Sequence, residues 1–70
     1  MNLYEKLASE ISRVTALRCQ YESMRGIQGV NVEPAMLLMS AAIEGGIGAA
    51  GRGEVDEMIE AVRELEGFSE

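Results

Sequence analysis

A run of small side chains at residues 40–53 restricts how this chain can fold more than any other feature of its sequence. The run reads SAAIEGGIGAAGRG. In one interpretation, a helix that begins near Pro34 continues through the run, and Ala41, Gly45 and Ala49 then lie four residues apart on one side. Such a ridge lets the backbone of another helix approach closely. This interpretation predicts a close contact between helices.

A second interpretation ends the helix at Gly45, because each glycine costs about 1 kcal/mol relative to alanine inside a helix. Residues 46–51 then form a loop that matches G-x-G-x-x-G, and the backbone N–H groups of such a loop can hold a phosphate group. The dinucleotide fingerprint requires a preceding strand, however, and the apolar segment 35–43 has the character of a helix. The candidate residues of this alternative anion site are Gly46, Gly48, Gly51 and Arg52.

The small size of the chain predicts a single domain, residues 1–70, in which a sufficient core is difficult to build. Chains of this length usually rely on disulfides, a metal or oligomerisation. A single cysteine, Cys19, excludes an internal disulfide, and the absence of histidine argues against a zinc site. We therefore expect the chain to associate with itself, as a homodimer or a higher oligomer.

Residues 3–25 are expected to form one long helix, because apolar side chains recur in the heptad-like pattern of a coiled-coil seam. At 1.5 Å per residue this helix is about 35 Å long, whereas a compact domain of this size is roughly 28 Å across. The helix should therefore extend beyond its own domain and pack against a second copy. The residues expected in self-association are Leu7, Val14, Leu17, Tyr21, Met24, Gly45 and Ala49.

The next two segments are expected to contribute to a core that two subunits share. Ile27, Val30 and Val32 alternate with polar residues or glycine, which indicates an extended loop that places these side chains on the core. A second helix, over residues 34–45 or longer, is apolar on every side, and such a helix is normally buried. One chain of 70 residues is too small to surround it, which favours a core shared between subunits.

A third helix is expected at residues 54–66, with an apolar face opposite an acidic face. The apolar face contains Val55, Met58, Ile59, Val62 and Leu65. The acidic face, which is the predicted partner-binding surface, contains Asp56, Glu57, Glu60 and Glu64. The second half of the chain is acidic, and the whole chain carries a net charge of −6, which disfavours duplex nucleic acid and favours a partner with a basic protein surface.

No residue pattern points to catalysis or to a bound cofactor. The chain has no histidine and no nucleophile motif, and its carboxylates are expected on a solvated face rather than in a pocket. The acidic residues also lack the spacing of a calcium-binding loop. We therefore predict that the protein is not an enzyme and has no catalytic, metal or cofactor site.

The N-terminal residues MNLYEK do not resemble a signal peptide, and no window approaches about 18 uninterrupted apolar residues. We expect a cytoplasmic protein that does not enter the membrane. The combined patterns predict an all-α, three-helix homodimer that binds and modulates a larger protein, as inhibitors, adaptors and antitoxin-like proteins do. There are two alternatives: a small-ligand binder that holds an anionic nucleotide at residues 45–53 of an oligomer, and a structural subunit of a larger assembly.

Overall fold

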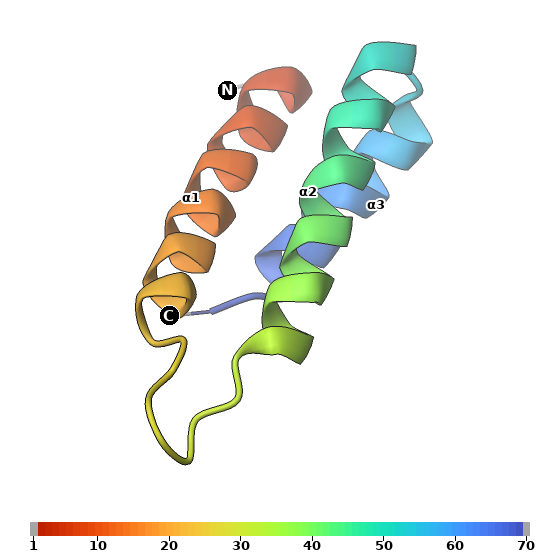
Figure 1. The fold of residues 1–70 in the computed structure, drawn as a ribbon. Helices are drawn as coiled ribbons and strands as arrows, with labels where there is room; N and C mark the ends of the chain where they lie inside the picture. Colours follow the sequence, from red (N-terminus) through yellow and green to blue (C-terminus); the bar gives the residue numbers. More distant parts are fainter. Residues whose placement is uncertain (1, 70) are drawn as a thin grey trace.

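The computed structural model describes residues 2–69, which form three α-helices. The helices are α1 (Leu3–Ser23), α2 (Glu33–Arg52) and α3 (Val55–Glu66). Figure 1 shows α1 and α2 running side by side in opposite directions, with α3 returning behind them. No strand occurs in the described range. The expected all-α fold is therefore confirmed.

One apolar core fills the space between the helices, and each helix packs against both of the others. The core side chains of each helix recur three or four residues apart, so that they share one face. The largest fully buried side chains are Leu7, Val14, Leu17, Met39, Met58 and Leu65. Each of them contributes about 1.5–3 kcal/mol by leaving water. This cluster is the main source of stability of the fold.

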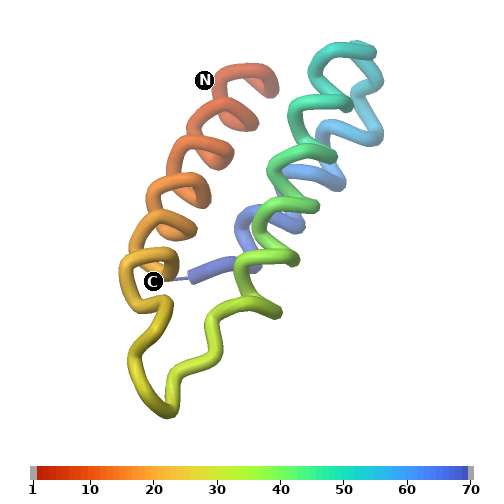
Figure 2. Tube along the Cα trace, viewed as in Figure 1, coloured from red at the N-terminus to blue at the C-terminus, as the bar shows by residue number. Residues whose placement is uncertain are grey.

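The bundle is elongated, with extents of 42 × 19 × 16 Å. The expected overhang of the first helix assumed a nearly spherical domain. The predicted overhang is wrong, because the 20 residues of α2 run alongside the 21 residues of α1 and match its length (Figure 2). Leu7, Val14 and Leu17, which were expected in a seam between subunits, lie in the core of their own chain. Tyr21 and Met24 are half-buried.

The connection between α1 and α2 differs from the expected extended loop. Val32 is buried as expected, but Ile27 and Val30 are 53% and 43% exposed. The chain turns twice in this connection, at Gly26 and Gly29, whose φ angles are +92° and +85°. These turns direct the two side chains away from the core, so their predicted packing is wrong.

Helix α2 continues through the glycine run and ends at Arg52, so the helical interpretation of this run is correct. Gly46 faces α1, and a Cβ atom at this position would lie 3.3 Å from Cδ1 of Leu7 and 3.4 Å from Cδ1 of Ile11. The close approach of the two helices offsets part of the cost of glycine inside a helix. The helix ends at Gly53, which has a left-handed φ of 68° that favours glycine.

Helix α3 buries its inner side at Met58, Val62 and Leu65, as the pattern predicted. Two further members of the expected apolar face, Val55 and Ile59, are exposed instead. Ile59 lies about 100° around the helix from Met58, which directs it away from the centre of the core. Val55 lies in the first turn of the helix, at the end of the bundle. The apolar face of α3 is therefore narrower than predicted.

Candidate interaction surfaces

One side of α2 exposes apolar and small residues instead of a charged surface. Leu37 and Leu38 are 69% and 64% exposed, although they belong to the most apolar of the described helices. The exposed residues recur at the spacing of one helix face. We call this surface the outer face of α2, and it consists of the exposed Leu37, Leu38, Ala41 and Gly45 and the half-buried Gly48. Two neighbouring helices cover only the opposite side, so α2 is not buried on every side within one chain.

Small residues lie on both sides of α2, for different reasons. Gly46 faces α1, whereas a Cβ atom built at Gly45 meets nothing within 4 Å. Ala49 was expected on the same ridge as Ala41 and Gly45, but it is only 1% exposed. Each step of four residues turns the position about 40° around the helix, so the ridge rotates from the outer face into the core. Packing within the chain accounts for Gly46 and Ala49 and leaves Gly45 without a contact.

A depression beside the outer face holds an arginine and a glutamate without ion-pair partners. Thr15 and Arg18 of α1 line it together with Ser40, Ile43 and Glu44 of α2. Nε of Arg18 donates a hydrogen bond of 2.8 Å to Oγ of Ser40, which holds the guanidinium against α2. Across residues 2–69, neither Arg18 nor Glu44 has an opposite charge within 4.0 Å. Both charges are therefore available beside the outer face.

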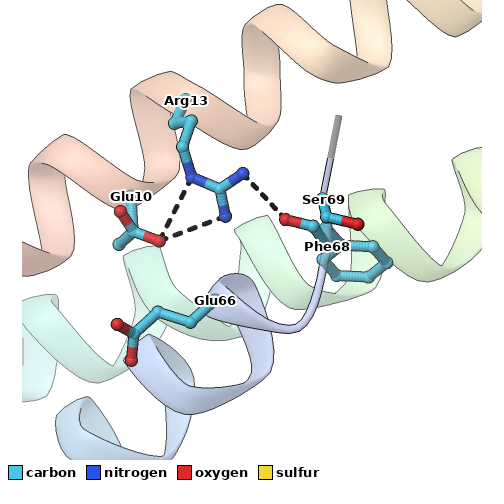
Figure 3. A pocket seen from close by; sticks show the side chains of 5 residues that line it. All are labelled: Glu10, Arg13, Glu66, Phe68 and Ser69. Carbon is cyan, nitrogen blue, oxygen red and sulfur yellow. Dashed lines mark hydrogen bonds and ion pairs between the residues drawn. The ribbon is translucent and has the colours of Figure 1, made fainter.

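A second depression, shown in Figure 3, contains a buried glutamate and an arginine that reaches α3. Oε1 of Glu10 accepts hydrogen bonds from Nε and Nη2 of Arg13, at 3.3 and 3.1 Å. Arg13 also donates from Nη1 to the carbonyl of Phe68 and from Nη2 to the carbonyl of Leu65, both at 2.7 Å. Carbonyl groups at a helix end have no partner within the helix. Arg13 therefore secures the C-terminal end of α3.

We call the contacts of Arg13 with Glu10, Leu65 and Phe68 the Arg13 clamp. They use most of the hydrogen-bond donors of Arg13 for acceptors of the chain itself, so the depression is a structural feature. The sequence analysis did not identify it. A signal was present, because Glu10 follows Leu7 by three residues and precedes Val14 by four, on the apolar side of α1. A carboxylate at such a position requires a cation beside it.

The predicted anion loop does not form. Residues 46–51 lie inside α2, so the backbone N–H groups of Gly46, Gly48 and Gly51 take part in the helical hydrogen bonds. Only the first N–H groups of a helix are free to bind an anion, and these residues lie near the other end. The loop interpretation of this segment is therefore wrong.

Arg52, the cation of that predicted site, has partners within the chain. Its Nε lies 3.0 Å from Oε2 of Glu57, its Nη2 contacts the same oxygen, and Glu54 lies 4.0 Å away. The hydrogen bond from Arg52 lowers the pKa of Glu57 below its usual range, and the same contact raises the pKa of Arg52. This exposed ion pair connects the end of α2 to the start of α3.

The predicted partner-binding residues lie on the solvent side of α3. Asp56, Glu60 and Glu64 are exposed and make no ion pair within the part of the chain that the structure describes. Glu57 differs from them, because it is bound to Arg52. Arg63 is also exposed and is the cation of α3. The acidic face of α3, which we define as Asp56, Glu60 and Glu64, therefore keeps a negative charge that the chain does not neutralise.

Helix α2 is long and apolar enough to cross a membrane by length and composition, and 28% of its most apolar 18-residue stretch is buried in the bundle. Spanning a bilayer would place Glu44 near the middle of the hydrocarbon, where a charge is costly. It would also separate α2 from the core that it shares with α1 and α3. Within residues 2–69, no group of three or more His, Cys, Asp or Glu side chains could hold a metal ion.

Comparisons with protein-family models, with curated proteins and with solved structures gave no significant match. Functional inference for this chain therefore starts from its own surfaces. Two of them are distinctive: the apolar outer face of α2 and the acidic face of α3.

Proposed function

We propose that this protein is a non-enzymatic interaction module of the cytoplasm that binds and modulates a larger protein. Two surfaces support this proposal: the acidic face of α3, where we place the larger partner, and the outer face of α2, which the chain itself leaves uncovered. Leu37 and Leu38 lie there side by side, and both are more than three-fifths exposed. Large contiguous apolar patches are rare on monomeric soluble proteins and mark surfaces that bind other molecules.

The energetics of these side chains favour a protein contact. Burial of a leucine side chain contributes about 1.5–3 kcal/mol. Leu37 and Leu38 gain little of this in the isolated chain, because most of their surface stays in water. A protein that covers both would recover this free energy, and the small residues Ala41 and Gly45 beside them would allow its backbone to approach closely.

Charge indicates the chemistry of the larger partner. The chain carries a net charge of −6, and the acidic face of α3 contributes three carboxylates without ion-pair partners in the described residues. A basic protein surface complements this face and gains association rate from the attraction. A small bundle of this kind can act by covering part of that surface, which is how inhibitors and antitoxin-like proteins modulate their targets.

The test is affinity capture from the host lysate at low and high salt, followed by mass spectrometry. The variant Glu60→Lys/Glu64→Lys reverses two charges of the acidic face, and Glu5→Lys/Glu22→Lys makes the same change in net charge on α1. We expect wild type and the α1 variant to retain a basic protein that the α3 variant loses. Capture of this protein should weaken as salt rises, because surface charges are screened. Equal capture by all three proteins would contradict the proposed role of α3.

A further inference from the structure

We propose that a second copy of the chain covers the outer face of α2. The two α2 helices pack antiparallel about a two-fold axis that lies between their outer faces, at the level along the helix between Ala42 and Ile43, and Glu44 of each copy pairs with Arg18 of the other. This inference rests on the proposed function, because it names the molecule that occupies one of the two interaction surfaces. The acidic face of α3 stays free for the larger partner.

The position of Glu44 restricts what can cover the outer face of α2. This residue is the only charged one between Glu33 and Arg52, and it lies about halfway along α2, exposed on the edge of the outer face beside Arg18. Covering this carboxylate with purely apolar surface would leave a charge without a partner, which is strongly unfavourable. A covering molecule that brings a cation to the level of Glu44 would avoid this cost, because Arg18 of the same chain lines the same depression but makes no ion pair with Glu44.

Arg18 of a second copy is that cation. Its guanidinium is held beside Ser40, on the same edge of the outer face as Glu44, and it has no carboxylate partner within residues 2–69. A two-fold axis that relates antiparallel helices brings equivalent edges together. Rotation about an axis at the level between Ala42 and Ile43 places the second copy's Glu44 level with Ala41, next to Ser40 and Arg18 of the first copy.

The same register matches large side chains with small ones. Leu37 of one copy lies level with Gly48 of the other, and the open space at Gly45 lies beside the axis. A parallel pair would instead place Leu37 level with Leu37, and it would bring the edge that carries Glu44 and Arg18 against the opposite edge of the second copy. The ion pair and the match of large with small side chains therefore both favour the antiparallel arrangement.

The area of the proposed dimer interface indicates how tightly the two copies should bind. Two helices of about 30 Å in contact through one face bury on the order of 1,000 Å² in total, which is at the low end for specific association. We therefore expect a reversible dimer with a micromolar dissociation constant.

A charge-swap series, measured by sedimentation equilibrium on the full chain, tests the proposal. We expect Arg18→Glu and Glu44→Arg each to weaken dimerisation by about tenfold or more, and the double variant to restore most of the wild-type affinity. Arg63→Glu and Glu60→Arg carry the same charge changes away from the proposed interface, and they should leave the dissociation constant within a few fold. Gly45→Leu, which meets no neighbour within its own chain, should stay folded by circular dichroism and lose the dimer.

Three outcomes would overturn the proposal. One is a wild-type chain that stays monomeric at every concentration. Another is a double variant that stays as weak as the two single variants. The third is a monomeric chain that binds phosphatidylcholine vesicles through Leu37, shown by loss of binding in Leu37→Glu, which would make a lipid surface the occupant. Equal capture by wild type and Glu60→Lys/Glu64→Lys with dimerisation intact would, by contrast, contradict only the proposed larger partner, so the two proposals fail separately.

Discussion

Gly45 and Gly46 are neighbours in the chain, but they face different surroundings. A side chain at Gly46 would enter the contact with Leu7 and Ile11, whereas a side chain at Gly45 would point into open space. The cost of glycine in a helix is the same at both positions, about 1 kcal/mol relative to alanine. Within one chain, only Gly46 allows a close helix contact that offsets this cost. A close contact with another molecule would therefore explain why glycine is present at position 45.

The pair provides a matched prediction for stability. We expect Gly46→Leu to lower the free energy of unfolding by about 1–3 kcal/mol, because it overpacks the α1–α2 contact. Gly45→Leu should leave it unchanged or raise it by up to about 1 kcal/mol, because leucine is a better helix former. Urea unfolding of dilute protein measures both. A larger loss in Gly45→Leu than in Gly46→Leu would show that the two sides of α2 are assigned wrongly.

The Arg52–Glu57 pair predicts a dependence of stability on pH. Because the folded state lowers the pKa of Glu57, protonation of this carboxyl favours unfolding. The contribution of the pair is complete above the ordinary carboxyl pKa of about 4.3 and is lost as pH falls through the lower folded value. The difference in urea midpoint between wild type and Glu57→Gln should therefore be small, because the pair is exposed, and should shrink further in acid. A difference that grows with acidification would contradict the assigned contact.

At the scale of single elements, the helices were predictable and their outward sides were not. The apolar spacing predicted the ends of α1 and α3 to within about two residues, because core contacts fix that spacing. The glycine run left two interpretations open, since the compensation for glycine comes from Leu7 and Ile11, which are distant in sequence. The exposed side of α2 depends on where α1 and α3 pack, and a nearly uniform apolar pattern does not contain this information.

The end of α3 depends on α1 through the Arg13 clamp. We expect Arg13→Ala to lower the free energy of unfolding by about 2–3 kcal/mol, because it removes hydrogen bonds to two carbonyl groups and leaves the buried Glu10 with only Lys6, 3.7 Å away, as a cation. Amide hydrogen exchange in the last turn of α3 should become faster. Arg63→Ala, which removes an exposed arginine of α3, is the control and should change stability by no more than about 0.5 kcal/mol. Equal effects of the two substitutions would argue against the clamp.

At the scale of the whole molecule, the chain combines a small complete core with an apolar face that it does not cover itself. The three helices bury their inner sides, so the isolated chain has a defined fold. The outer face of α2 and the acidic face of α3 belong to different helices, so one copy can use both at the same time. A dimer through α2 would present two acidic faces to larger partners, and two linked contacts bind more tightly than one.

The most direct measurement for the outer face of α2 is light scattering of the wild-type chain over a wide range of concentrations, together with the melting temperature at each one. We predict a mass that rises from 7.6 kDa toward twice this value through the micromolar range. The melting temperature should rise in parallel, because association stabilises the folded state by mass action. A mass that stays at 7.6 kDa, with a melting temperature independent of concentration, would contradict self-association through this face.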